Sequence, residues 1–300
     1  MSAVSRYVQA LWGMARPSQI VSIYMVFVLG LLMAAAFGFT WKLGAVLIAI
    51  PIVLFASLAV HYANEYADVE TDALANRTAY SGGSGVLPSG LVPRQTALIA
   101  AWVALVIACA LQGLALALGL HAIEALLIMA LIVILGWSYS LPPLKLAWRG
   151  WGELDNAVLG AIAMPMYGYS LLANQIDWLP IVLLLPVFLI DFANLLATTW
   201  PDREPDRAVG KYTLATQWPV ERLRILYRAA VITGYGSLIS LAILGWLPWI
   251  VAGLAALALP LSVWGIRTYT RQESAAPSVW AMVVIITGYM LAWGGLSLSV

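Results

Sequence analysis

The stretch LGAVLIAIPIVLFASLAVHYANEYADVETD, residues 43–72, decides the fold, because an apolar run passes without a break into an acidic segment. A helix needs about 20 apolar residues to cross the hydrocarbon core of a bilayer. Residues 43–63 meet this length and contain no Asp, Glu, Lys or Arg. The stretch therefore predicts a transmembrane helix whose end carries carboxylates to the membrane surface.

The composition of the whole chain extends this prediction beyond one segment. Of its 300 residues, 63% are hydrophobic and only 10% are charged, whereas soluble proteins carry about 25% charged residues. So few charges cannot cover a soluble surface, which excludes soluble enzymes and disordered chains. The net charge of +1 offers no basic surface for nucleic acid. The single cysteine, Cys109, excludes a disulfide framework.

Apolar runs of spanning length recur along the chain, and no linker separates them. We expect an all-α membrane protein formed by a single transmembrane domain, residues 1–300. Its nine predicted transmembrane helices have the approximate ranges 18–39, 43–63, 96–118, 122–140, 154–173, 178–200, 228–246, 248–267 and 278–298.

Positive charge alternates between the two sides of this predicted topology. Fourteen of the 15 Lys and Arg residues fall on one side, and only Lys42 falls on the other. Cytoplasmic loops of membrane proteins carry the excess of Lys and Arg. We therefore expect an integral, multi-pass protein with its N-terminus and charged loops in the cytoplasm and its C-terminus outside.

Two of the cytoplasmic loops are acidic as well as basic. In the first, Asn64, Asp68 and Asp72 follow the second apolar run at intervals of four residues. Four residues make just over one helical turn, so the three side chains are expected on one face of a helix. Glu65 and Glu70 fall elsewhere around that helix.

The second acidic segment is DFANLLATTWPDREPDRAVGK, residues 191–211. Asp202 and Asp206 are four residues apart, and Asn194 and Thr198 continue the same helical line behind them. Asp191 precedes Asp202 by about three turns and is expected to point the same way.

Four aspartates gathered at one membrane surface require a cation, because like charges at this spacing destabilise a helix. Ligands that are all oxygen favour Mg²⁺, Ca²⁺ or Mn²⁺ over zinc or copper. Mg²⁺ typically takes one or two carboxylates and completes its shell with water and substrate phosphates. With Arg and Lys nearby, the two segments indicate a diphosphate held through Mg²⁺; the alternative is that they are solvated loop charges.

These segments resemble the paired aspartate motifs of the UbiA superfamily of intramembrane prenyltransferases. NEYADVETD, residues 64–72, matches the first motif in full, and DREPDRAVGKYTL, residues 202–214, matches the second. YSLPPLK, residues 139–145, resembles the family's Tyr-Ser-x-x-Pro-x-Lys element, and Arg16-Pro17 resembles the residues before its first span. The chain departs from the family at Thr198, where relatives often have Asn.

The resemblance implies a bundle of nine transmembrane helices around a central cavity that opens to the cytoplasmic side. It also implies an Mg²⁺-dependent enzyme whose substrates are a prenyl diphosphate and a lipophilic acceptor, acting in membrane lipid with no need for an oligomer. The residues it implies are Asn64, Asp68, Asp72, Asp202 and Asp206 for the metal; Arg16, Arg77, Lys145 and Lys211 for the substrate; and Tyr139, with the four aspartates, for catalysis.

Other polar residues lie outside these motifs. Ionisable residues within apolar runs are functional candidates by default, so Asp191 is a candidate to hold or deprotonate the acceptor. The favoured alternative is a packing hydrogen bond to Asn, Thr or Tyr on a neighbouring helix. Glu153 and Asp155 are interpreted as solvent-facing charges, with acceptor binding as the alternative. SGGSGVLPSG, residues 81–90, lacks the Lys-Ser/Thr of a nucleotide-binding loop and is interpreted as a flexible cap that orders on substrate binding.

The function that best fits these features is transfer of a polyprenyl group to an aromatic, quinone-precursor-like acceptor. The Gly-Gly-x-x-Val-Leu pattern at residues 82–87 resembles the branch that prenylates dihydroxynaphthoate for menaquinone. A chlorophyllide or glyceryl phosphate lipid as acceptor, and cyclisation of the prenyl chain, stay open. A cation-coupled transporter is the alternative from another class. The sequence gives neither the prenyl chain length nor the oligomeric state.

Overall fold

The computed structural model describes residues 2–299, and within this range it contains no strand, only an isolated bridge between Arg149 and Tyr212. Its α-helices are α1 Ala3–Ala15, α2 Pro17–Ala36, α3 Leu43–Leu74, α4 Gln95–Ala117, α5 Ile123–Ser140, α6 Gly152–Val158, α7 Met164–Ala173, α8 Trp178–Leu183, α9 Leu185–Thr199, α10 Arg203–Ala208, α11 Leu214–Gln217, α12 Val220–Ile243, α13 Trp249–Ala256, α14 Leu259–Thr268 and α15 Ala276–Ser297.

Seven helices of the described chain are long and apolar enough to cross a membrane. Six of them are α2, α3, α4, α5, α12 and α15, and the seventh runs from α6 through a π-helical turn, Leu159–Ala163, into α7. The number rises to eight if α13 and α14, which meet at an angle of 42°, are counted as one span. The chain is therefore an integral, multi-pass helical membrane protein.

The prediction of nine transmembrane helices is not confirmed, because two of the predicted runs are broken. Residues 178–200 form two helices, α8 and α9, and Pro186 lies in the first turn of α9. Residues 248–267 form α13 and α14, and Pro260 lies in the first turn of α14. Proline lacks a backbone N–H and is favoured in the first turn of a helix, so Pro186 and Pro260 suit the starts of α9 and α14.

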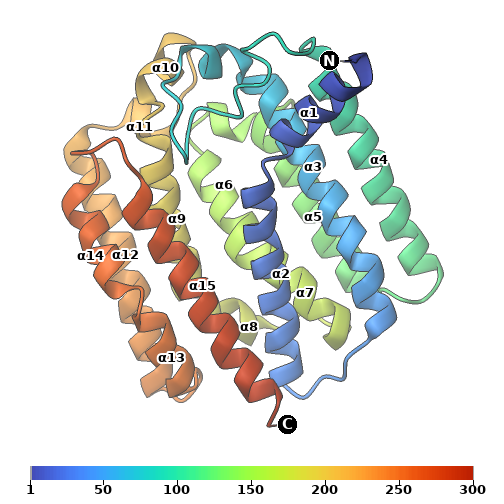
Figure 1. Ribbon diagram of the computed structural model, residues 1–300. Helices are drawn as coiled ribbons and strands as arrows, with labels where there is room; N and C mark the ends of the chain where they lie inside the picture. Colours follow the sequence, from blue (N-terminus) through green and yellow to red (C-terminus); the bar gives the residue numbers. More distant parts are fainter. Residues whose placement is uncertain (1, 300) are drawn as a thin grey trace.

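The long helices form one bundle, with the short polar helices gathered at one end (Figure 1). The labels α1, α10 and α11 lie at the end where the N-terminus is found, and the C-terminus lies at the opposite end. Helices distant in sequence pack together in this bundle, including α2 with α7 and α15, and α9 with α12. The polar segments of the sequence are thereby brought to one end of the bundle.

Helices α2 and α7 approach closely through glycine. A Cβ atom on Gly30 would overlap the backbone carbonyl of Pro165, and one on Gly168 would overlap that of Phe27. Small residues at helix interfaces let membrane helices pack backbone to backbone. This contact fixes α2, which leads out of Arg16, against the helix that leads out of α6.

Helix α1 is an amphipathic helix that the apolar runs of the sequence do not reveal. Val4, Val8 and Trp12 are exposed at intervals of four residues, while Ala10 and Met14 are buried on the other side. A helix with this pattern beside the membrane is typical of one that lies in the interface plane.

Candidate functional site

The two aspartate motifs meet at the end of the bundle where α10 and α11 lie. Helix α3 continues past its apolar run to Leu74, so Asn64, Asp68 and Asp72 share one helix as predicted. The side chain of Lys211 joins this helix to the second motif. Its Nζ lies 2.8 Å from Asp68 Oδ2 and 3.5 Å from Asp206 Oδ1.

The second motif is not the straight extension of α9 that its spacing predicted. Helix α9 ends at Thr199, and α10 begins at Arg203, with Pro201 between them. The prediction that Asn194 and Thr198 continue the line of Asp202 is therefore wrong, because proline interrupts the helix. Asp202 and Asp206 instead belong to one separate turn, in which Asp206 N donates to Asp202 O over 2.8 Å.

The charges in this turn perturb one another. Burial, together with the carboxylates of Asp68 and Asp202, raises the pKa of Asp206 to about 7, although Lys211 opposes the shift. Burial lowers the pKa of Lys211, but the Asp68 and Asp206 carboxylates and the Tyr139 phenol outweigh it and hold that pKa above its ordinary value. Lys211 thus stays cationic between two groups of acids.

The donor atoms of the site fit a hard cation. Asp68 Oδ1, Asp72 Oδ2 and Asp202 Oδ1 are buried and have no hydrogen-bond partner, and buried carboxylate oxygens ordinarily have one. Within residues 2–299, no three His, Cys, Asp or Glu side chains are close enough to hold one metal ion. The set is therefore unlike a closed protein cage, but it fits Mg²⁺, which binds through few carboxylates together with substrate phosphates.

Asn64 is tied to both α3 and α5. Its Nδ2 donates to Asp68 Oδ2 over 2.9 Å and lies 3.2 Å from Ser140 Oγ, at the end of α5. These contacts link Asp68 to the end of α5 through Asn64, which suits the predicted place of Asn64 in the site.

Arg16 binds Glu65 rather than an aspartate of the motifs. Its Nε lies 2.9 Å from Glu65 Oε1, and the side chain of Glu65 is fully buried. The other partner of Glu65 is Ser84, whose N and Oγ donate over 3.0 and 2.6 Å. Glu65, which the spacing argument placed outside the motif, therefore joins the N-terminal segment to the glycine-rich loop.

The glycine-rich loop, residues 81–90, lies over both motifs. Gly82 N donates to Asp202 Oδ2 over 3.2 Å. Gly83 has a φ of 63°, and a Cβ there would overlap the carboxylate of Asp72, so glycine is the residue that fits without backbone strain and without moving that carboxylate. The side chain of Arg77 runs along the loop beside Gly85. The loop covers the aspartates in this structure, and its predicted ordering by substrate stays a prediction.

The remaining residues of the predicted substrate set lie close to Lys211. Lys145 has its Nζ 4.8 Å from the centre of the Trp148 ring, and Lys211 lies 5.9 Å from the same ring. Tyr139 packs against Gly152 at the start of α6. The segment between α5 and α6 therefore lines the site beside Lys211.

Asp191 is not brought into contact with the aspartate motifs. Its Oδ1 accepts a hydrogen bond of 3.2 Å from Asn194 Nδ2 on the same helix, and its Oδ2 faces Gly160 in the π-helical turn. Because Asn194 belongs to the same helix, this bond is not the one to a neighbouring helix that the packing alternative predicted. The π-helical turn beside Asp191 is of a kind frequent at functional sites.

Glu153 and Asp155 are not solvent-facing charges, because only 2% and 7% of their surfaces are exposed. Glu153 accepts hydrogen bonds from Leu214 N and Thr199 Oγ1. Sequence reasoning missed this burial because a carboxylate after a basic loop is ordinarily solvated, and no local pattern reveals that α9 and α11 cover it.

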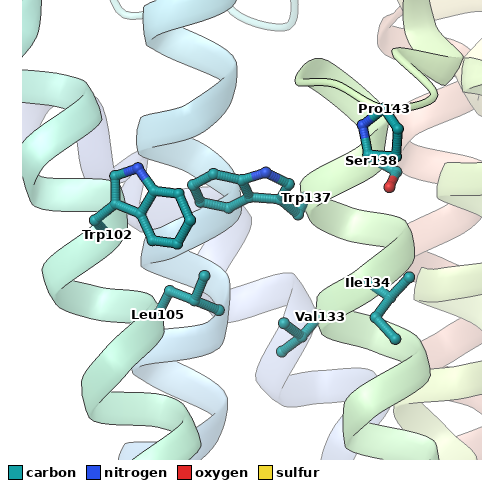
Figure 2. A pocket seen from close by; sticks show the side chains of 7 residues that line it. All are labelled: Trp102, Leu105, Val133, Ile134, Trp137, Ser138 and Pro143. Atoms are coloured by element: carbon teal, nitrogen blue, oxygen red, sulfur yellow. The ribbon is translucent and has the colours of Figure 1, made fainter.

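Apolar grooves lie apart from the aspartates. One, of about 280 Å³, lies between α4 and α5, where the Trp102 and Trp137 rings are 4.5 Å apart. Figure 2 shows its lining residues, Trp102, Leu105, Val133, Ile134, Trp137, Ser138 and Pro143. The predicted central cavity open to the cytoplasm stays a prediction.

Curated relatives cover most of the chain. It is 28% identical to 1,4-dihydroxy-2-naphthoate octaprenyltransferase of Mycobacterium tuberculosis (strain ATCC 25618 / H37Rv) over 268 residues, 86% of this chain and 87% of that protein. It is 23% identical to the Bacillus subtilis (strain 168) protein of the same name over 282 residues, 91% of this chain and 86% of that protein.

Solved structures share the fold. A UbiA homolog from Archaeoglobus fulgidus bound to GPP and Mg²⁺ aligns with a TM-score of 0.65 at 17% identity, covering 95% of this chain and 99% of that one. A digeranylgeranylglyceryl phosphate synthase structure aligns with a TM-score of 0.67 at 16% identity, covering 98% and 99%. The model of the UbiA prenyltransferase family matches residues 23–286. With its paired aspartate motifs at one end of a helical bundle, the chain belongs to the UbiA prenyltransferase family.

Proposed function

We propose that the protein transfers a polyprenyl group from a prenyl diphosphate to a dihydroxynaphthoate-like aromatic acceptor, in an Mg²⁺-dependent reaction at the cytoplasmic face of the membrane. The observation that carries the proposal is the meeting of the two motifs across Lys211, 2.8 Å from Asp68 and 3.5 Å from Asp206. The two motifs also contain buried carboxylate oxygens that have no hydrogen-bond partner, on Asp68, Asp72 and Asp202.

The headgroup of the substrate belongs at this cluster of charges. We assign Asn64, Asp68, Asp72, Asp202 and Asp206 to the metal, and Arg16, Arg77, Lys145 and Lys211 to the substrate. Bound Mg²⁺ supplies neutralisation of the charge that develops on the leaving diphosphate. Lys211 supplies fixed positive charge for the same oxygens in a buried setting, where such a charge acts strongly. Arg77, which is exposed, adds positive charge from beside the glycine-rich loop.

The reaction breaks the bond between the first prenyl carbon and the diphosphate oxygen, and the bonding electrons leave with the diphosphate. The allylic cation that remains is stabilised by aromatic faces, for which Tyr139 and Trp148 are placed beside Lys211. An aromatic carbon of the acceptor then forms the new carbon–carbon bond. That carbon loses a proton or, where it carries the carboxylate, carbon dioxide, and the electron pair of the broken bond restores the aromatic ring. The glycine-rich loop over the motifs excludes water that would otherwise hydrolyse the cation.

The choice of acceptor rests on the relatives, since curated proteins that match most of this chain are named as dihydroxynaphthoate octaprenyltransferases. We assign Asp191, with Asn194, to the acceptor side. Its place beside the π-helical turn and apart from the diphosphate motifs supports this assignment.

Purified protein in lipid nanodiscs tests the proposal directly. With geranylgeranyl diphosphate, dihydroxynaphthoate and Mg²⁺, we expect release of diphosphate and a prenylated product by mass spectrometry, and neither after chelation of Mg²⁺. Parallel reactions with a chlorophyllide and with a glyceryl phosphate lipid test the alternative acceptors. A reaction without acceptor tests cyclisation of the prenyl chain. Absence of diphosphate release in all of them would overturn the proposed function.

The metal assignment is tested by Asp68→Ala and Asp202→Ala, one from each motif. Each should abolish Mg²⁺-dependent diphosphate release while the purified variants elute and melt as folded protein. Full activity in either variant contradicts the assignment.

A further inference from the structure

The placement of Lys211 depends on a neighbouring segment of the chain, because Lys211 lies on no regular helix. It belongs to the loop between α10 and α11, and its N donates to Asp206 O over 2.8 Å. The loop pairs with the segment between α5 and α6, where Tyr212 N donates to Trp148 O over 3.3 Å and Arg149 forms a bridge with Tyr212.

Glu153, in the first turn of α6, closes this pairing. Its Oε1 accepts from Leu214 N over 3.1 Å, and Leu214 is the first residue of α11. The N-cap of α11, Thr213, makes no capping hydrogen bond with its own side chain. The same oxygen lies 3.4 Å from Thr199 Oγ1, the last residue of α9. One buried carboxylate oxygen therefore joins α6 to both ends of the segment that carries Asp202, Asp206 and Lys211.

The other oxygen of Glu153 has no described hydrogen-bond partner. A buried carboxylate with one oxygen uncompensated is costly, which argues that the bonds made by the first oxygen are needed. Those bonds require an acceptor atom and not a charge, since both donors are neutral groups.

We propose that Glu153 is a positioning residue that holds Lys211 between the two aspartate motifs by accepting the N–H of Leu214. This inference deepens the proposed function and rests on it for its kinetic consequences, but not for its structural one. Glu153 acts through the loop and does not touch the reacting atoms.

The chain offers a direct readout, because it contains only three lysines: Lys42, Lys145 and Lys211. In wild-type protein, Lys211 is ion-paired with Asp68, and the side chain of Lys211 is only 11% exposed. It should therefore react slowly with an amine-acylating reagent. Lys42, at the start of α3 and far along the helix from Asp68, serves as the internal reference in each sample. Peptide mass spectrometry gives the labelling ratio of Lys211 to Lys42.

Glu153→Ala should raise this ratio roughly tenfold, because the loop loses its anchor. Glu153→Gln should leave it near wild type, because the amide oxygen still accepts the N–H of Leu214. Leu214→Pro removes the donor and keeps the carboxylate, and proline suits the first position of a helix. Leu214→Pro should therefore also raise the labelling ratio. This variant keeps the proposal testable if Glu153→Ala does not fold.

Kinetics separate positioning from direct chemistry. Glu153→Ala should lower kcat/KM for prenyl diphosphate roughly tenfold, Glu153→Gln should restore most of it, and Glu153→Ala should add no further loss to Lys211→Ala. Unchanged labelling in both Glu153→Ala and Leu214→Pro overturns the inference. So does a Glu153→Gln variant that loses activity while its labelling stays at the wild-type ratio, because the carboxylate would then take part in the chemistry. If wild-type protein shows no transfer, the proposed function fails, while the labelling ratios still decide the role of Glu153.

Discussion

At the scale of single residues, burial decides which charges matter. Glu65 and Glu70 lie on the same helix five residues apart, yet Glu65 is fully buried against Arg16 and Ser84, whereas Glu70 is 69% exposed and lies 3.4 Å from Arg94. Exposed pairs contribute little to stability, whereas a buried charge that loses its partner is strongly destabilising.

Replacing these two glutamates gives a matched test of stability. Glu65→Ala should lower the free energy of unfolding by about 3 kcal/mol, because it leaves the guanidinium of Arg16 largely buried and unpaired. Glu70→Ala should change it by less than about 1 kcal/mol. Chemical denaturation in detergent micelles measures both. Equal effects would show that the Arg16 contact contributes no more than a surface pair.

The glycine-rich loop allows a second matched pair, since Gly83 and Gly90 have similar positive φ angles, 63° and 71°. Alanine at either position pays a similar backbone strain of about 1–2 kcal/mol. Only the Cβ at residue 83 meets Asp72; nothing lies within 4 Å of a Cβ at residue 90.

Gly83→Ala should therefore lower prenyl transfer about a hundredfold by displacing the carboxylate, whereas Gly90→Ala should keep activity close to wild type. Initial rates of diphosphate release measure the difference. Equal rates for the two variants would show that the position of the Asp72 carboxylate does not affect the reaction.

Some of the site could be predicted at this scale and some could not. The alignment of Asn64, Asp68 and Asp72 follows from helical periodicity, because α3 continues without a break to Leu74. The contact of Lys211 with Asp68 joins residues 143 positions apart, and no local spacing contains it. The burial of Glu65 and Glu153 likewise depends on segments that fold over them.

At the scale of helices, proline and glycine set the departures from the sequence pattern. Hydropathy predicted the long helices, because an apolar run needs no partner to indicate a span. It did not predict the breaks in residues 178–200 and 248–267, because hydropathy averages across proline. It also missed α1, whose apolar side chains are spaced along one face and not gathered in a run.

The contact of α2 with α7 predicts a third matched pair. Gly30→Ala places a methyl group on the carbonyl of Pro165 and should lower the free energy of unfolding by about 1–3 kcal/mol. Gly295→Ala, on α15, meets nothing within 4 Å and should be neutral or slightly stabilising. Thermal unfolding in the same detergent compares them. A Gly30→Ala variant as stable as Gly295→Ala would mean that the close contact of α2 with α7 does not contribute to the free energy of unfolding.

At the scale of the whole molecule, charge and architecture agree. The N-terminus lies at the end of the bundle that holds the aspartate motifs, and the C-terminus lies at the other end (Figure 1). The topology predicted from the sequence assigns 14 of the 15 Lys and Arg residues to the side of the N-terminus. From the positive-inside rule we therefore propose that the site faces the cytoplasm.

Single cysteines test this orientation. In a Cys109→Ser background, Ser299→Cys should react with a membrane-impermeant maleimide in intact cells, whereas Ser2→Cys should react only after the membrane is opened. Gel-shift labelling reports both. The reverse pattern would place the aspartates outside and contradict the proposed topology.

The contacts of the glycine-rich loop also bear on how the products of the proposed reaction would leave the site. Gly82 is hydrogen-bonded to Asp202 of the second motif, and Ser84 is hydrogen-bonded to Glu65, which lies beside the first, so the loop is attached to both halves of the site. In the proposed reaction, inorganic pyrophosphate would leave into water, and we expect its release to require both of these hydrogen bonds to break. Lipophilic substrates and product would instead exchange with the bilayer, so we expect release of pyrophosphate to limit the rate of turnover.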